Sequence, residues 1–244
     1  MLSNRIKSLP ASATLAMAAK ARELKNQGID IIGLSLGEPD FNTPEFIKDA
    51  AIQAVKDNYN SYSPVDGYTD LKSAICKKFK RDNGLEYQAS QIVVSTGAKQ
   101  SIANVCMILL NPGDEVLLPA PYWVSYSAIA TLAEAKSIII PSSIETDFKI
   151  TPKQLEQAIT PKTKLVMFNS PNNPSGAIYS EEEYRALGAV LKKYPDIYIL
   201  SDEIYEHINY GTPHFSIAAI PELYDRTITV NGVAKAFAMT GWRI

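Results

Sequence analysis

The chain has 244 residues, of which 46% are hydrophobic and 20% are charged, and its formal net charge is -2. A chain of this length and composition can bury a sizeable core in one large α/β domain, with or without an added arm. Basic and acidic residues are interspersed, which argues against a nucleic-acid or membrane partner and favours small-molecule chemistry. Cys76 and Cys106 form no CxxC pair, so a reducing, cytoplasmic setting is expected.

His207 and His214 are the only histidines of the sequence. This scarcity argues against histidine-based metal sites and against a Ser-His-Asp triad, so no metal is predicted. No apolar run approaches the roughly 20 residues that a membrane-spanning helix needs. Another type of residue must therefore carry the proton transfers.

The first 90 residues predict three helices, over residues 11–26, 44–57 and 69–82. The second of these places Pro44 at its first position and carries an apolar stripe that includes Phe46 and Ile47. We therefore expect this helix to pack against another surface. Turn-forming residues at 37–40 and 64–67 connect the helical segments.

From residue 91 onward, short β-branched runs alternate with helical patterns. The runs are residues 92–94, 115–118, 138–140, 165–168, 197–200 and 227–230. Ser180 and Glu183 have the spacing of a capping box that opens one of the helices. Such strands, separated by amphipathic helices, predict a mostly parallel sheet covered on both faces. In sheets of this kind, ligands bind beyond the carboxyl ends of the strands.

Polar residues follow several of these strands. Gly97, Ala98 and Lys99 lie where a turn enters a helix, and the free N–H groups of such a turn can hold a phosphate, although a simple capped helix explains the pattern as well. Asp202 ends the strand at 197–200, and Tyr205 follows by one helical turn. Asp202 could equally be a helix cap.

Four further residues complete the set at the strand ends. Asn173 lies in a loop made rigid by two prolines, Trp123 offers an aromatic face, Lys235 follows the last strand, and Arg243 lies eight residues later. A lone lysine is usually a solvated surface residue. Together, however, these residues match the needs of pyridoxal phosphate: an amine for its aldehyde, an anion beside its ring nitrogen, donors to its 3-oxygen, a stacking ring and cations for its phosphate.

The sequence resembles class I pyridoxal-phosphate-dependent aminotransferases over its whole length, and the bacterial aspartate aminotransferases in particular, some of which also act on prephenate. The segments that carry the resemblance are 37–41 (GEPDF), 122–126 (YWVSY), 169–176 (NSPNNPSG), 201–206 (SDEIYE) and 231–244 (NGVAKAFAMTGWRI). The resemblance implies an α/β fold of type I, with a mostly parallel sheet flanked by helices in α/β/α layers. Residues 1–44 would form an N-terminal arm and the first part of a small domain, and residues 45–244 a cofactor-binding large domain truncated at its C-terminal end.

The resemblance also implies roles for the residues around the cofactor ring. Lys235 would form the Schiff base and then move the substrate proton, and Asp202 would keep the pyridine nitrogen protonated. Tyr205 and Asn173 would bond the 3-oxygen. Trp123 would stack on the ring, and Trp123 and Asn173 would also lie beside the substrate.

The phosphate and the substrate carboxylate would lie on other residues. The backbone of Gly97, Ala98 and Lys99 would bind the phosphate together with Arg243, and Gly37 would contact the substrate near its carboxylate. Tyr62 would reach the phosphate of a neighbouring subunit, which implies a homodimer with shared sites. Ala234 departs from the hydroxyl residue that many family members carry before the lysine, so one phosphate hydrogen bond would be absent or supplied by water.

Three structural expectations follow from the same resemblance. The Ala120–Pro121 and Asn173–Pro174 bonds should be cis. A strand beginning near Trp242 should run antiparallel between the segments near Ile92 and Thr227. The family continues past residue 244 into a small domain with the arginine that binds the substrate carboxylate, so residues 1–244 alone are not expected to be a competent enzyme.

The expected activity is transfer of an amino group between an amino acid, aspartate or glutamate, and a 2-oxo acid. A β-lyase or a decarboxylase of the same fold stays open, because most of the residues named above serve the cofactor rather than select the reaction. A cofactor-binding regulatory module fused to a DNA-binding domain is a further alternative, and the lack of a basic N-terminal domain argues against it.

Overall fold

The computed structural model describes residues 2–9, 11, 13–33, 37–211 and 213–244. Their strands form a parallel sheet in the order β2-β1-β3-β4-β5. The strands are β1 (Glu115–Pro119), β2 (Lys136–Ile140), β3 (Thr163–Asn169), β4 (Tyr198–Asp202) and β5 (Thr227–Val230). The predicted parallel sheet is thus confirmed, and the strand order reverses at β1, where doubly wound sheets open a ligand crevice.

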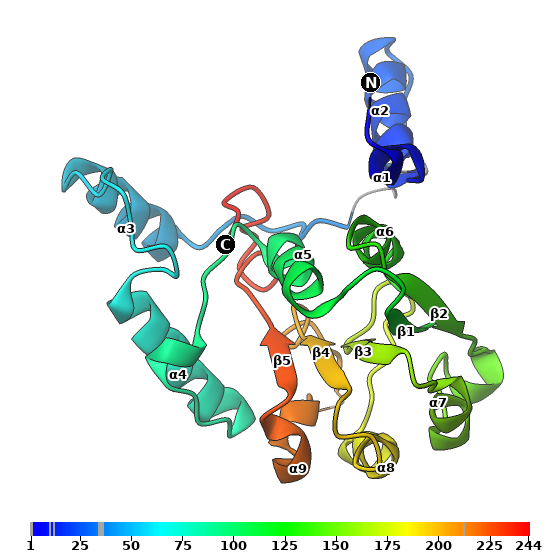
Figure 1. The fold of residues 1–244 in the computed structure, drawn as a ribbon. Coiled ribbons are helices and arrows are strands. Elements are labelled where there is room, and N and C mark those ends of the chain that lie inside the picture. Colours follow the sequence, from blue (N-terminus) through cyan, green and yellow to red (C-terminus); the bar gives the residue numbers. More distant parts are fainter. Residues whose placement is uncertain (1, 10, 12, 34–36, 212) are drawn as a thin grey trace.

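Helices cover both faces of the sheet (Figure 1). The helices α5 (Ala98–Leu109) and α6 (Ser125–Leu132) lie on one face, and α7 (Pro152–Ala158), α8 (Glu181–Leu191) and α9 (Pro221–Tyr224) lie on the other. Successive strand residues face opposite sides, so Leu117 joins one hydrophobic core while Val116 and Leu118 join the other. All three are fully buried, which explains why β1 shows no polar alternation in its sequence.

Local signals explain where several elements begin and end. The Ser180–Glu183 capping box opens α8 as predicted, and a second box formed by Thr151 and Gln154 opens α7. The helix α4 (Thr69–Asn83) ends at Gly84, which adopts the left-handed conformation. Short 3₁₀ turns connect other elements: η1 (Ala89–Gln91), η2 (Ile144–Thr146) and η3 (Ile217–Ala219). None of the described helices has the length and apolar character needed to span a bilayer.

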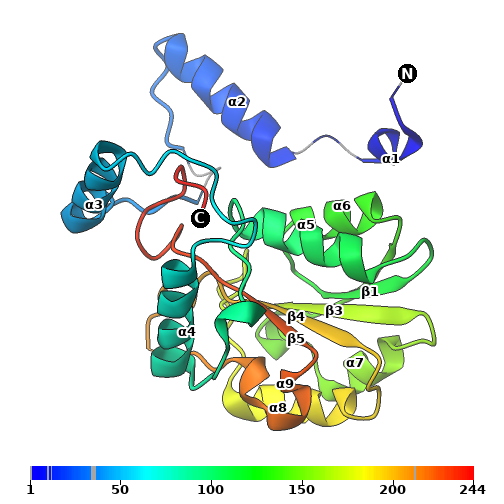
Figure 2. The same cartoon turned by 60° about the vertical axis from the view of Figure 1, so that its left-hand side comes forward.

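The N-terminal helices stand outside the sheet layers (Figures 1 and 2). They are α1 (Asn4–Lys7), α2 (Ala13–Asn26) and α3 (Glu45–Lys56). Pro44 is the residue that precedes α3 rather than its first helical residue, because its extended ψ of 142° places the helix start at Glu45. The expected packing of α3 is not met by the described residues, since α3 has no buried residue and Phe46 is 70% exposed.

The strand predicted at 92–94 does not form. Ile92 has an extended backbone, but Val94 donates its N–H to the carbonyl of Asp66 (3.1 Å) instead of joining a ladder. A strand needs a neighbour to pair with, and no described strand pairs with the outer edge of β5. The strand predicted to begin near Trp242 is also absent from the described structure: Trp242 lies in a turn closed by its bond to Met239 (3.1 Å).

Candidate active site

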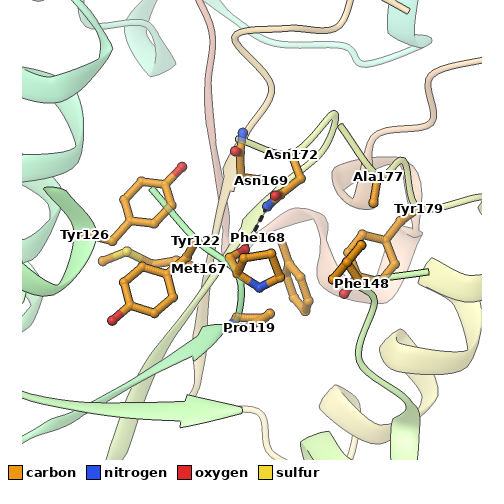
Figure 3. Close-up of a pocket in the computed structure, with 11 residues that line it drawn as sticks. Pro119, Tyr122, Tyr126, Phe148, Met167, Phe168, Asn169, Asn172, Ala177 and Tyr179 are labelled. Atoms are coloured by element: carbon orange, nitrogen blue, oxygen red, sulfur yellow. Dashed lines mark hydrogen bonds between the residues drawn. The ribbon is translucent and has the colours of Figure 1, made fainter. Parts of the chain in front are cut away.

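The loops after β1 and β3 meet beside each other at the carboxyl edge of the sheet. The Ala120–Pro121 and Asn173–Pro174 bonds are cis, as predicted, and Ser170–Pro171 is a third cis bond that was not predicted. Together with the strand ends, these loops line a small hollow whose walls include aromatic rings and two asparagines (Figure 3). Asn172 donates from Nδ2 to the carbonyl of Pro121 (3.3 Å), which fixes one loop against the other.

The start of α5 provides free backbone donors beside a guanidinium group. No acceptor from the described residues faces the N–H groups of Ala98 and Lys99 at the first turn of the helix. Gly97 has φ of 86°, and a Cβ atom placed on it would lie 2.7 Å from Nη2 of Arg243. The same Nη2 donates to the carbonyl of Thr96 (3.4 Å). Free donors, a helix N-terminus and a guanidinium group therefore lie together, an arrangement that suits a phosphate.

Asp202 ends β4 as a buried carboxylate that is 3% exposed. Its Oδ2 accepts a hydrogen bond from the hydroxyl of Tyr126 (2.6 Å), and its Oδ1 accepts from the N–H of Ile204 (3.2 Å). The pKa of Asp202 is raised to about 6, because burial and the neighbouring charge of Glu203 raise it more than the two donors lower it. Residues 204–207 form a turn rather than a helix, so the alternative that Asp202 is only a helix cap is wrong.

Glu203 follows Asp202 and is also buried, but its contacts are different. Its Oε1 accepts hydrogen bonds from Ser201 (2.8 Å) and Ser216 (2.6 Å), and its Oε2 lies 3.0 Å from Nε2 of His214. Neighbouring residues at a strand end point in opposite directions, which explains why the two carboxylates have separate partners. Sequence reasoning assigned Glu203 no role, and only the contacts of Ser216 and His214 reveal that its charge is enclosed.

The amide and phenol groups predicted to share a ligand do lie together. Asn173 Nδ2 is 3.4 Å from the hydroxyl of Tyr205, and the Asn173 N–H donates to Oδ1 of Asn169 (2.7 Å). Asn169 in turn donates to the backbone carbonyl of Asp202 (2.9 Å). Burial raises the pKa of Tyr205, while the hydrogen bond from Asn173 lowers it. This chain of bonds links the loop after β3 to the end of β4.

Lys235 lies in the loop after β5 and reaches a segment far away in the sequence. Its Nζ donates to the carbonyl of Gly37 (2.8 Å) and lies 5.8 Å from the ring centroid of Tyr205. Burial lowers the pKa of Lys235; the charge of Arg243 lowers it further, and that of Glu38 raises it. The site thus contains a partly buried amine that deprotonates more readily than an exposed lysine.

Two hydrogen bonds hold the segment around Gly37 against the loop that carries Lys235. Thr43 donates from Oγ1 to the carbonyl of Ala238 (2.7 Å), and Thr240 donates from Oγ1 to Oε1 of Glu38 (3.0 Å). These bonds span about two hundred residues of sequence, so they depend on the completed fold.

Trp123 lies between α5 and Tyr126. The rings of Trp123 and Tyr126 are perpendicular, with centroids 5.5 Å apart, and Nζ of Lys99 lies 4.9 Å from the Trp123 ring. The contacts thus link the predicted residues around the strand ends, except for Tyr62, whose side chain is fully exposed. Sequence reasoning gave Tyr126 no role; it lies in the first turn of α6 and donates its N–H to the carbonyl of Trp123 (3.0 Å).

Comparisons with known proteins agree on one relationship. A family model described as aminotransferase class I and II matches residues 29–244. The aspartate/prephenate aminotransferase of Nitrosomonas europaea is 54% identical over 245 residues, an alignment that covers 100% of this chain and 62% of that protein. The aspartate aminotransferase of Bacillus subtilis is 49% identical, with coverage of 100% and 62%.

Solved structures give the same result. The aspartate aminotransferase of Rhizobium meliloti superposes with a TM-score of 0.96 at 47% identity, covering 100% of this chain and 61% of that one. The Thermus thermophilus aspartate aminotransferase with maleate gives a TM-score of 0.96 at 44% identity, covering 100% and 63%. The chain therefore spans about three fifths of the length of these relatives.

Proposed function

Because this chain belongs to the family of class I and II aminotransferases, we propose that the protein that carries it transfers an amino group between an amino acid and a 2-oxo acid, with pyridoxal phosphate as its cofactor. Aspartate and glutamate are the proposed donors, since the relatives are named aspartate or aspartate/prephenate aminotransferases. The observation that carries the proposal is the convergence of a partly buried amine, a buried carboxylate and a phosphate cradle at one sheet edge.

The residues of the site fit this cofactor. Ala98 and Lys99 would donate their N–H groups to the phosphate, and Arg243 would bind it with its guanidinium fork. Gly97 lets the guanidinium of Arg243 lie against the start of α5, because a Cβ atom at this position would lie 2.7 Å from Nη2. When bound, pyridoxal phosphate supplies an aldehyde that captures amines and a ring that accepts the electron pair released from the substrate α-carbon.

The carboxylate and the donors around the ring would set its protonation and its orientation. Asp202 would hold the proton on the pyridine nitrogen, because a buried carboxylate stabilises an adjacent positive charge strongly. Tyr205 and Asn173, which already lie together, would donate to the 3-oxygen. Trp123 would cover one face of the ring.

Lys235 would serve first as the amine that binds the aldehyde and then as a base. Once the substrate amine replaces it, Nζ of Lys235 would take the proton from the substrate α-carbon and return it at the cofactor carbon C4′. Burial favours this role because it lowers the pKa of Lys235 and enlarges the fraction of neutral amine. The carbonyl of Gly37 orients the amine, and the Gly37 segment would lie beside the substrate carboxylate.

The domain organisation and the assembly are part of the proposal. Residues 1–44 would form the arm and the first part of a small domain, and residues 45–244 the cofactor-binding domain. We propose a homodimer in which Tyr62 reaches the phosphate of the neighbouring subunit. The exposed side chains of Phe46 and Val55 on α3 and of Tyr62 support an interface at this surface.

The alternative chemistry is β-elimination or decarboxylation with the same cofactor. The names of the relatives favour amino transfer. The two chemistries differ in what happens to the cofactor: amino transfer converts it to its amine form when aspartate is added without a 2-oxo acid, whereas elimination and decarboxylation return it unchanged.

The proposal is tested on the intact protein. We expect a visible absorption band from the bound cofactor, fixation of the cofactor to the Lys235 peptide by borohydride, and conversion of the band when aspartate is added. Lys235→Ala should lose turnover by several orders of magnitude, because both the covalent link and the proton carrier disappear. Recovery of the label on a different lysine would contradict the assignment.

A further inference from the structure

One buried tyrosine contacts the carboxylate that is proposed to control the cofactor ring. Tyr126 lies on α6, is 1% exposed, and donates its hydroxyl to Oδ2 of Asp202 at 2.6 Å. The two residues come from elements 76 positions apart, so the contact depends on how α6 packs on the sheet. A distance of 2.6 Å is typical of an O–H donor to a charged carboxylate.

Tyr126 also touches a second residue of the proposed site. Its ring meets the ring of Trp123 edge to face, at 90° and 5.5 Å between centroids. Trp123 is the residue proposed to stack on the cofactor ring, so the side chain of Tyr126 contacts both this residue and the carboxylate of Asp202. The hydroxyl of Tyr126 and the N–H of Ile204 are the donors to the two oxygens of Asp202 in the described structure.

We propose that Tyr126 is a positioning residue that keeps Asp202 ionised, so that the proton shared by Asp202 and the cofactor stays on the ring nitrogen. The inference rests on the proposed function, because it concerns how the site would hold pyridoxal phosphate. A carboxylate that accepts a strong hydrogen bond is a weaker base. The proton is then held by the pyridine nitrogen rather than passed to Oδ1 or Oδ2 of Asp202.

The surroundings of Asp202 show why a donor is needed there. Burial and the adjacent charge of Glu203 both raise the pKa of Asp202, and the hydroxyl of Tyr126 and the N–H of Ile204 lower it. Tyr205 is a further titratable group near Asp202. Without the Tyr126 hydroxyl, only the N–H of Ile204 would remain to stabilise the charge of Asp202 against the effect of burial. The neutral form of Asp202 would then be favoured.

The test uses the intact protein loaded with pyridoxal phosphate that carries ¹⁵N in its ring. The wild-type protein should give the ¹⁵N chemical shift of a protonated pyridine, whereas Tyr126→Phe should move this shift toward that of neutral pyridine. Cofactor affinity should fall by about tenfold, the typical effect of losing one hydrogen bond to a charged group. Both readouts are independent of turnover.

A second pair of variants asks whether Tyr126 acts through Asp202. In the Asp202→Asn background, Tyr126→Phe should change cofactor affinity by less than about twofold, because the charge that the hydroxyl supports is gone. Tyr179→Phe is the matched control: its hydroxyl is also buried and lines the same hollow, but it accepts from the N–H of Ile150 (2.9 Å). This control should leave the ¹⁵N shift unchanged.

The outcomes separate the two proposals. A wild-type protein that binds no cofactor would defeat the proposed function itself. A wild-type protein with a protonated ring, together with an unchanged ¹⁵N shift in Tyr126→Phe, would overturn only the role of Tyr126. An equal shift in Tyr179→Phe, or a full tenfold loss in the Asp202→Asn background, would overturn it as well.

Discussion

Asp202 and Gly97 each have a proposed role in the site and an energetic cost to the fold. Asp202 is a carboxylate placed where burial opposes its charge, and Gly97 lies at the start of α5 with backbone angles that other residues rarely adopt. Both features destabilise the protein alone and become useful when a cationic ring or a phosphate is bound. Such positions are typical of functional sites.

The first prediction concerns the pH dependence of the cofactor-free protein. The pKa of Asp202 is about 6 when folded, above its ordinary value of 3.8, so the folded state binds this proton more tightly than the unfolded state. The resulting contribution to stability is present below pH 4 and is lost as the pH rises through 6. The free energy of unfolding of Asp202→Asn should therefore rise relative to that of the wild type by up to about 3 kcal/mol between pH 4 and 7. Denaturant unfolding at several pH values measures this difference, and a constant difference would contradict the prediction.

The second prediction concerns Gly97→Ala. The φ of 86° with ψ of 157° is accessible to glycine almost alone, so alanine should cost about 1–3 kcal/mol of folding free energy. Its Cβ would also displace the guanidinium of Arg243, so cofactor affinity should fall, as measured by equilibrium dialysis. Gly113→Ala is the control, because Gly113 has φ of 91° and no atom within 4 Å of an added Cβ. If both variants bind the cofactor equally well, Gly97 forms no part of a phosphate cradle.

At the scale of elements, the strand ends and helix starts place the site. Parallel strands end at one edge, so Asp202, the last residue of β4, and Lys235, in the loop after β5, both lie at the same edge of the sheet. The first turns of two helices differ in this respect. The free N–H groups of α5 face the site, whereas a capping box provides acceptors for N–H groups at the start of α8.

The third prediction tests that capping box. Ser180 Oγ accepts from the Glu183 N–H (3.2 Å), and Glu183 Oε2 accepts from the Ser180 N–H (2.7 Å). Ser180→Ala should cost about 1 kcal/mol of unfolding free energy, and Ser180→Asp much less, because aspartate can also cap. Ser143→Ala, at the exposed start of the short η2, should have an effect below about 0.5 kcal/mol. Equal losses in the Ala and Asp variants would show that the cap contributes nothing.

At the scale of the whole molecule, the apolar surface around α3 has no cover from the described residues. Phe46 is 70% exposed and Val55 is 78% exposed, while Tyr62 nearby is fully exposed. Surfaces of this kind usually mark an interface. The proposed homodimer would account for the exposure of these side chains, including Tyr62.

The fourth prediction tests the shared site by mixing two inactive variants of the intact protein. Lys235→Ala lacks the amine, and Tyr62→Ala lacks the tyrosine. In a mixed dimer, one site combines Lys235 of the second variant with Tyr62 of the first, so cofactor affinity and turnover should recover at that site. If Tyr62 served its own subunit, mixing would restore nothing. Val55→Glu, which places a charge on the apolar surface of α3, should lower the dimer fraction in sedimentation and abolish recovery.

The sequence by itself determined most of the local elements and the types of residue in the candidate site. Strands β1 and β3 were predictable because burial on both faces leaves apolar runs, and β2 and β5 because they are rich in β-branched residues. Most of the residues proposed to hold the cofactor were recognisable because they follow a strand or open a helix. The tertiary structure alone decided which distant residues touch: Tyr126 with Asp202, Gly97 with Arg243, and Lys235 with Gly37. It also decided that residues 92–94 form no strand, since their local pattern is that of a strand. Pairing and side-chain contact depend on neighbours far away in sequence, which no local pattern encodes.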